Sequence, residues 1–264
     1  MKYSADFKKI ARDALIGNWR TAVLTGFVAS LLGGTIASSG VSGNGNSSNS
    51  SNTDLSSVLQ NNEAYELILS IFISLAAVVA VLSLVKIILG GATKLGYAKF
   101  NLNLIDKKPV AFSDLFSQYD RIGQGFVMNF LTGLYLVLWT LLLFIPGIIK
   151  SYSYAMTPYI LAEHPEMTVN DAITESRRIM NGNKGRLFCL NFSFIGWAFL
   201  MLVPVFVLMP LFFLGTVGVV IWAVAVFASI IVGSLFLIPY QEAAYAAFYR
   251  EITHYVPAYQ NIEL

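Results

Sequence analysis

Residues 125–162 read GFVMNFLTGLYLVLWTLLLFIPGIIKSYSYAMTPYILA, and the way this stretch folds decides the topology of the chain. It is almost twice as long as the roughly 20 apolar residues that one helix needs to cross a bilayer. A proline followed by a glycine breaks a helix and lets the chain turn. We therefore expect a pair of helices broken at Pro146-Gly147, with Lys150 as the only cation near the middle of the stretch.

The composition is that of a membrane protein. Apolar residues make up 56% of the chain and charged residues 12%, against about 25% charged residues in soluble domains. The net charge of +2 is too small to indicate a nucleic-acid partner. The single cysteine, Cys189, can form neither an internal disulfide nor a metal cluster. These features predict an all-α, polytopic helical bundle that forms one integral membrane domain over residues 1–264.

We expect about six transmembrane helices, together with amphipathic helices at the membrane surface. The apolar pattern places the spans at residues 21–38, 65–93, the two legs of the long stretch, 187–209 and 217–238. Residues 1–20 predict an amphipathic interface helix. The Ser/Asn/Gly-rich residues 39–62 predict a flexible non-cytoplasmic loop. Whether the leg at residues 148–162 spans fully or is re-entrant stays open at this point.

The distribution of lysine and arginine predicts the orientation. If the long stretch crosses twice, every cation except Lys150 lies on one side, which the positive-inside rule assigns to the cytoplasm. The connections at residues 94–124 and 163–186 and the tail at residues 240–264 are then cytoplasmic, as are both termini. Lys150 would stand apart, near the outer surface.

Small residues recur every four positions in two of the predicted spans. One stripe contains Gly26, Ser30, Gly34 and Ser38, and the other contains Ala225, Ser229 and Gly233. Such stripes let helices approach closely. They predict either a dimer seam or packing within one chain, where the two stripes could be partners.

Two groups of residues are candidates for a binding site. Placing a lysine within a membrane span costs free energy that another interaction must offset. Lys150 therefore either snorkels to the outer headgroups or faces a polar cavity for an anionic substrate or lipid headgroup. The residues expected around that cavity are Tyr152, Tyr154, Tyr159 and Glu242. The second group is a cytoplasmic cation cluster, which is either an anionic-lipid pocket or ordinary positive-inside topology. Its members are Arg177, Arg178, Lys184 and Arg186.

Motifs for chemistry are scarce. His164 and His254 lack metal-ligand spacing with a partner, and the nucleophile-elbow, phosphate-loop and zinc-protease motifs do not occur in the sequence. We therefore expect no catalytic residue, no metal site and no cofactor, and a protein that is not an enzyme.

Several tracts resemble a known family. They are LLLFIPGIIKSYSYAMTPYILAEHP, AITESRRIMNGNKGRLF, NFSFIGW and PYQEAAYAAFYRE. Together they are similar to the domain-of-unknown-function family 975, integral membrane proteins of Gram-positive bacteria of the Firmicutes type. The resemblance implies a multi-pass protein of the bacterial plasma membrane and implies no activity.

Two functional classes remain. The first is transport or handling of a small anionic or lipid-like substrate, favoured by Lys150 and the broken leg that follows it. The alternative is a non-catalytic membrane partner, scaffold or envelope-stress accessory protein. The expected partners are the lipid bilayer, anionic lipids, and either a homodimer or a larger membrane complex, with no nucleic acid.

Overall fold

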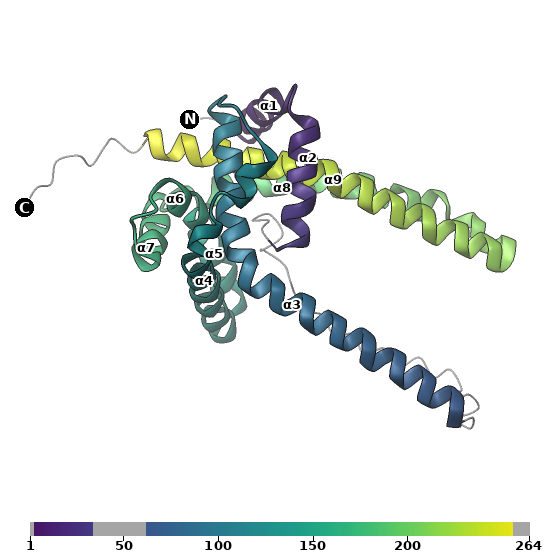
Figure 1. The fold of residues 1–264 in the computed structure, drawn as a ribbon. Helices are drawn as coiled ribbons and strands as arrows, with labels where there is room; N and C mark the ends of the chain where they lie inside the picture. The colour runs from purple at the N-terminus through teal and green to yellow at the C-terminus, as the bar shows by residue number, and fades with distance from the viewer. Residues whose placement is uncertain (1–2, 34–61, 256–264) are drawn as a thin grey trace, which may run out of the picture.

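A computed structural model describes residues 3–33 and 62–255, and all regular elements of these residues are helical (Figure 1). The predicted loop at residues 39–62 lies almost entirely outside the described residues, as does the end of the predicted span at residues 21–38. The elements in chain order are α1 (Ser4–Leu15), α2 (Trp19–Leu31), α3 (Asn62–Ile105), η2 (Phe112–Phe116), η3 (Tyr119–Arg121), α4 (Ile122–Leu142), α5 (Phe144–Tyr154), α6 (Thr157–Glu163), α7 (Val169–Ile179), α8 (Lys184–Val207), η4 (Met209–Leu214) and α9 (Gly215–Tyr255).

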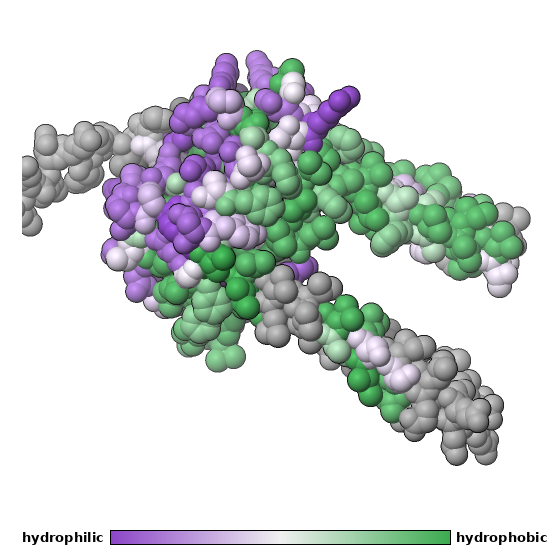
Figure 2. Space-filling view, viewed as in Figure 1, coloured by the Kyte–Doolittle hydropathy of each residue, from purple (hydrophilic) through white to green (hydrophobic). Residues whose placement is uncertain are grey.

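Three apolar arms project from a polar head. The arms are the first half of α3, the α4–α5 hairpin and the α8–α9 hairpin (Figure 1). Hydrophilic residues gather over the head, and hydrophobic residues cover the α8–α9 hairpin and the lower part of the α4–α5 hairpin (Figure 2). Within the described residues, three helical segments are long and apolar enough to cross a membrane, namely residues 112–142, 184–211 and 215–253. Their length and composition indicate a membrane protein, while the expectation of six crossings is not confirmed.

The buried core lies in the head rather than in the arms. We define the head as α1, residues 92–105 of α3, η2, α6, α7 and residues 240–255 of α9. Its largest fully buried side chains include Tyr97, Phe100, Tyr159 and Phe248. Residues 242–249 of α9 are buried without interruption. The segment predicted as a tail is therefore the central helix of the head, and small alanines in it allow close packing from several sides.

The amphipathic helix at the N-terminus is confirmed. Phe7, Ala11 and Leu15 are buried on one face of α1, while Lys9 and Arg12 are exposed on the other. The Phe7 ring meets the Phe248 ring of α9 edge-on, with the centroids 5.3 Å apart. This contact fixes α1 against the head, with its polar face outward.

The turn in the long apolar stretch lies at Leu143, and the prediction that it lies at Pro146-Gly147 is wrong. Leu143 is extended, with φ −159° and ψ 136°, and separates α4 from α5. Pro146 is the third residue of α5, where the backbone N–H has no helical partner, so proline is tolerated there. Gly147 packs against Thr140 of α4, where a Cβ would lie 2.5 Å from the threonine Oγ1.

The return leg does not form one long helix. α5 has 11 residues and spans about 16 Å, which is well short of the roughly 30 Å of a bilayer core. A turn at residues 155–156 then leads into α6, in which residues 157–162 are buried inside the head. The geometry of α5 and α6 therefore supports the re-entrant alternative for this leg.

Helix α7 begins and ends as its sequence predicts. The Thr168 hydroxyl accepts a hydrogen bond from the Asp171 backbone N–H at 3.2 Å, which caps the N-terminus. After the last turn, Gly182 has φ +78°, a conformation that favours glycine. The following residue, Asn183, is the N-cap of α8.

α3 and α4 cross with almost no side chain between them. A Cβ added at Gly91 would lie 2.0 Å from the carbonyl oxygen of Gly125, and a Cβ at Gly125 would lie 2.4 Å from the backbone nitrogen of Ala92. Two glycines thus allow the two backbones to touch at the point where the first arm joins the head.

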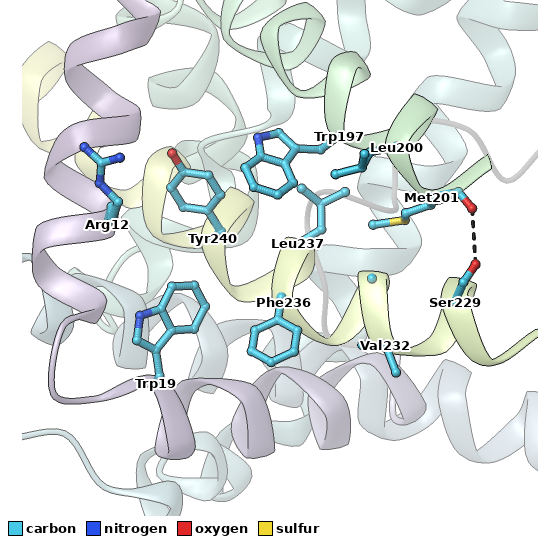
Figure 3. A pocket seen from close by; sticks show the side chains of 11 residues that line it. Arg12, Trp19, Trp197, Leu200, Met201, Ser229, Val232, Phe236, Leu237 and Tyr240 are labelled. Atoms are coloured by element: carbon cyan, nitrogen blue, oxygen red, sulfur yellow. Dashed lines mark hydrogen bonds between the residues drawn. The ribbon is translucent and has the colours of Figure 1, made fainter. Parts of the chain in front are cut away.

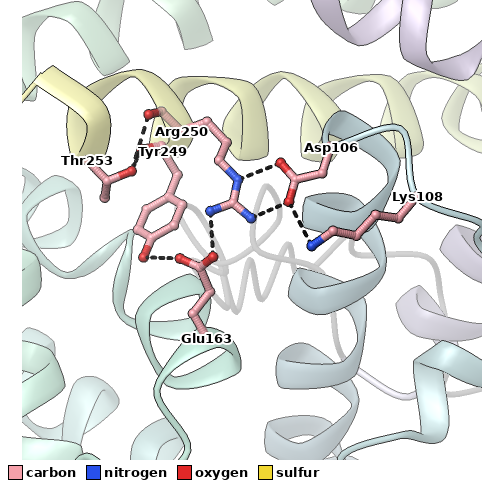
Figure 4. A network of polar contacts seen from close by, with 6 residues as sticks. All are labelled: Asp106, Lys108, Glu163, Tyr249, Arg250 and Thr253. Atoms are coloured by element: carbon pink, nitrogen blue, oxygen red, sulfur yellow. Dashed lines mark hydrogen bonds and ion pairs between the residues drawn. The ribbon is translucent and has the colours of Figure 1, made fainter.

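An ion network ties together the ends of α3, α6 and α9 (Figure 4). Arg250 donates to both carboxylate oxygens of Asp106, from Nε at 2.8 Å and from Nη2 at 2.6 Å. Its Nη1 donates to Glu163 at 2.5 Å, and the Tyr249 hydroxyl donates to the other Glu163 oxygen at 2.8 Å. Lys108 adds an exposed ion pair to Asp106 at 3.4 Å. The arginine of α9 therefore joins two elements that are distant in sequence.

Candidate functional site

A cavity of about 540 Å³ lies between the N-terminal helices and the α8–α9 hairpin (Figure 3). We call it the α9 cavity, because α9 supplies the largest share of its wall. Its volume falls within the range of about 300–1,000 Å³ that is usual for small-molecule sites. The lining residues are Arg12, Trp19, Trp197, Leu200, Met201, Ser229, Val232, Gly233, Phe236, Leu237 and Tyr240.

One end of the α9 cavity is polar and lies at the head. Arg12 of α1 lies beside Tyr240 of α9 there, and Trp19 of α2 lies nearby (Figure 3). The Trp19 ring packs against Phe236, with the centroids 5.9 Å apart, and the Trp197 ring packs edge-on against Tyr240 at 6.4 Å. Tryptophan and tyrosine favour the boundary between lipid and water, so this end has the side chains of a membrane interface.

The other end of the α9 cavity is apolar. The Ser229 hydroxyl donates to the Met201 carbonyl oxygen at 3.2 Å, so its polar group is already satisfied. Gly233 lets α8 approach closely, since a Cβ at this position would lie 2.7 Å from the Met201 side chain. These two small residues of α9 thus face α8, which shows that this stripe packs within the chain and is not the partner of the stripe in α2.

Two of the predicted substrate residues, Tyr159 and Glu242, meet inside the head. Both are fully buried, and the Tyr159 hydroxyl lies 3.4 Å from Glu242 Oε2 and 3.3 Å from the Glu242 carbonyl oxygen. Burial, and then the negative charge of Glu242, raise the pKa of Tyr159 well above its usual value, so the phenol remains a donor. Lys94 of α3 lies close enough for the negative charge of Glu242 to act on it. Burial lowers the pKa of Lys94, and the charge of Glu242 opposes that shift.

The other predicted substrate residues lie elsewhere, on α5. Tyr152 packs edge-on against Phe188 of α8, with the ring centroids 6.1 Å apart. Tyr154 is buried beside Tyr135 of α4, at 6.3 Å between centroids. Lys150 lies over the Trp139 ring, with Nζ 4.5 Å from the centroid. Tyr152 is connected to the Tyr159–Glu242 pair through Asn191, which donates to the Tyr152 hydroxyl at 3.4 Å and accepts from Tyr245 beside Glu242. The structure therefore brings Tyr159 and Glu242 into direct contact, and the other predicted residues lie outside that contact.

The four predicted lipid-contact cations also divide. Arg178 forms a two-pronged ion pair with Glu175, with its Nε 2.7 Å from one carboxylate oxygen. Arg186 pairs with Glu251 at 2.8 Å. Arg177 and Lys184 make no ion pair with a carboxylate within the described ranges. They lie close enough to Lys150 for their positive charges to act on it. The expectation that Lys150 stands apart from the other cations is therefore wrong.

The described residues contain no group of three or more His, Cys, Asp or Glu side chains that could hold a metal ion. Cys189 is exposed at the surface of α8.

Sequence reasoning missed the α9 cavity and the role of Lys94. Arg12 and Trp19 carried a signal, because they flank the interface between the first helix and the first predicted span. Nothing in the local pattern indicated that Trp197 and Tyr240 would join them, since these residues come together only when α1, α8 and α9 pack.

Comparison with known proteins identifies part of the chain. Residues 140–255 match the family model described as "Protein of unknown function (DUF975)". The match confirms the resemblance seen in the sequence and covers α5 to α9, including the α8–α9 wall of the cavity. No curated protein and no solved structure matches the chain.

Proposed function

We propose that this protein binds a lipid-like molecule, with an acyl chain in the α9 cavity and an anionic group beside Arg12. The observation that carries the proposal is an apolar cavity of about 540 Å³ with a cation and three aromatic polar groups at one end only. Amphiphilic molecules have the same division into an apolar length and a charged end. This polarity favours a lipid over a small polar solute.

The dimensions of the cavity support a chain-like ligand. The lining residues of α9 run from Ser229 to Tyr240, a distance of about 16 Å along a helix. This length is about half of the roughly 30 Å hydrocarbon core, which corresponds to one leaflet. The walls between these residues are leucine, valine, methionine and aromatic side chains, and such walls gain free energy by burying an apolar chain.

The position of α1 supports the orientation. Helix α1 packs its apolar face against the head, and Arg12 is exposed on its polar face, where it lines the cavity. A headgroup held there would remain at the interface while its acyl chain follows α9. We therefore propose lipid handling in one leaflet, without assigning a direction of transport.

Photo-crosslinking tests the proposal. The full chain in nanodiscs is irradiated with a phospholipid that carries a diazirine near the end of one acyl chain. We expect label in peptides that contain Leu200, Met201 and Ser229, and we expect Leu237→Trp to remove it by filling the cavity. Val224→Trp is the control, because Val224 is exposed on the same helix and does not line the cavity.

The charge at the mouth is tested separately. Arg12→Gln should weaken retention of an anionic phospholipid about fivefold, from about 1 kcal/mol per interfacial cation. Arg20→Gln is the matched control, since Arg20 is exposed and does not line the cavity. Uniform labelling of all exposed apolar faces, with no effect of Leu237→Trp, would show that the cavity holds no lipid chain.

A second candidate function is assembly with another membrane protein. The arms of α3 and of α8–α9 diverge from the head (Figure 1), and the apolar windows of the last two candidate spans are only 6% and 0% buried. A partner helix could cover these faces. Mass measurement of the protein extracted in mild detergent tests this, and a single-chain mass with bound lipid alone would favour the lipid proposal.

A further inference from the structure

We propose that Lys150, Arg177 and Lys184 form a second site, which binds the phosphate group of an anionic phospholipid where the α4–α5 hairpin enters the membrane. We call these three residues the hairpin cation cluster. The site is separate from the α9 cavity, and neither proposal depends on the other.

Contacts between three helices bring these cations together. The Ser176 hydroxyl of α7 donates to the carbonyl oxygen of Ser153, one turn after Lys150 on α5, at 2.8 Å. Arg177 follows Ser176, and its positive charge acts on Lys150. Tyr152 of α5 packs against Phe188 of α8, and Lys184 lies one turn before Phe188. Three cations from α5, α7 and α8 thus meet at the junction of their helices.

The cluster is a concentration of positive charge that the surrounding protein leaves uncompensated. Among residues 3–33 and 62–255, none of the three cations makes an ion pair with a carboxylate, whereas the adjacent Arg178 and Arg186 do. Partial burial, and then the positive charges of Arg177 and Lys184, lower the pKa of Lys150. Like charges held this close repel one another, and a bound anion would remove that repulsion.

The depth of the cluster matches the headgroup region. Residues 141–145 at the tip of the hairpin are all apolar and 61–85% exposed. Lys150 is about 10 Å from Leu143 along α5, less than half of the roughly 30 Å core. A tip immersed in the hydrocarbon of one leaflet would therefore hold Lys150 near the headgroups. Trp139, over which the lysine lies, is a residue typical of that boundary.

The residue types favour phosphate as the anion. The arginine guanidinium presents paired donors that match phosphate oxygens, and lysine ammonium groups add point charges with several donors each. A phospholipid also places its acyl chains beside the apolar tip of the hairpin, so one molecule satisfies both the charged and the apolar surfaces. A free phosphate compound would bind the three cations but would leave the apolar tip of the hairpin uncovered.

Lipid retention by the full-length protein tests the proposal. The site triple variant Lys150→Gln/Arg177→Gln/Lys184→Gln is compared with the charge-matched control Lys9→Gln/Lys99→Gln/Lys107→Gln. Each protein is titrated with phosphatidylglycerol and with phosphatidylcholine in mild detergent, and bound lipids are counted by native mass spectrometry. We expect phosphatidylglycerol to bind the site variant about 100-fold more weakly, from about fivefold per cation. Phosphatidylglycerol binding to the control variant should change little, and so should phosphatidylcholine binding to either variant.

Two further measurements complete the test. Arg177 is exposed, so the single variant Arg177→Gln should fold normally, and it should weaken phosphatidylglycerol binding about fivefold. This single variant keeps the proposal testable if the triple variant misfolds. An equal loss in the site and control variants would overturn the proposal, because it would show only general surface charge. Displacement of phosphatidylglycerol by inorganic phosphate at comparable concentration would also overturn it, because the ligand would then be a soluble phosphate compound.

Discussion

Replacing Arg250 with glutamine should open the head at the junction of α3, α6 and α9. The guanidinium makes three charge-assisted hydrogen bonds at 2.5–2.8 Å, two to Asp106 and one to Glu163. Its side chain is about 20% exposed, so the surrounding water only partly weakens these bonds. Breaking a fully buried pair costs about 3–5 kcal/mol, and we expect about 2–3 kcal/mol here because of the residual exposure.

The control uses the same carboxylate. Lys108 also pairs with Asp106, but its side chain is 61% exposed, and an exposed pair contributes about 0.2–1 kcal/mol. Unfolding of both variants in detergent can be followed by tryptophan fluorescence against heat or denaturant. If Arg250→Gln destabilises no more than Lys108→Gln does, the network is superficial and the reasoning is refuted. A double-mutant cycle with Asp106→Asn would then measure the coupling directly.

Two further substitutions test the packing of α3. Gly91→Ala should destabilise the folded protein by about 1–3 kcal/mol, as overpacking does, because the new Cβ would lie 2.0 Å from the Gly125 carbonyl oxygen. Gly123→Ala is the control in the same thermal assay, since a Cβ at Gly123 would have nothing within 4 Å. Lys94→Met should cost about 3–5 kcal/mol, because it removes a buried positive charge on which Glu242 acts, and adding Glu242→Gln should recover most of this loss. A double variant no more stable than Lys94→Met would show that the two charges do not compensate each other.

Local features could be predicted from the sequence, and contacts between distant segments could not. The amphipathic helix near the N-terminus follows from spacing over a few turns and is confirmed, and the Thr168 cap of α7 depends on spacing within one turn. The break at Pro146-Gly147 was displaced by three residues, because proline also fits the first turn of a helix. The sequence showed that the long apolar stretch must break, but it did not show that the break lies at Leu143 and not at Pro146-Gly147.

The candidate sites show the same division. The meeting of Tyr159 with Glu242 was expected, but Lys150 was placed with them and lies instead beside Arg177 and Lys184. The cation near Glu242 is Lys94, which lies far from it in the sequence. A charged residue in an apolar sequence needs a compensating partner, and that need could be predicted from composition. The identity of the partner depends on which helices pack together.

Helix α9 connects the two halves of the molecule physically. Its residues 229–240 line the cavity, and its residues 242–252 form the centre of the head. Pro239 lies inside this helix at the junction, where it removes one backbone hydrogen bond and allows a change of direction. Gly26 of α2 packs against Pro239, since a Cβ added at this glycine would lie 3.5 Å from the proline ring. Because one continuous helix carries both the cavity wall and the Arg250 network, a ligand that displaces Leu237 or Tyr240 acts on the same helix that joins α3 and α6.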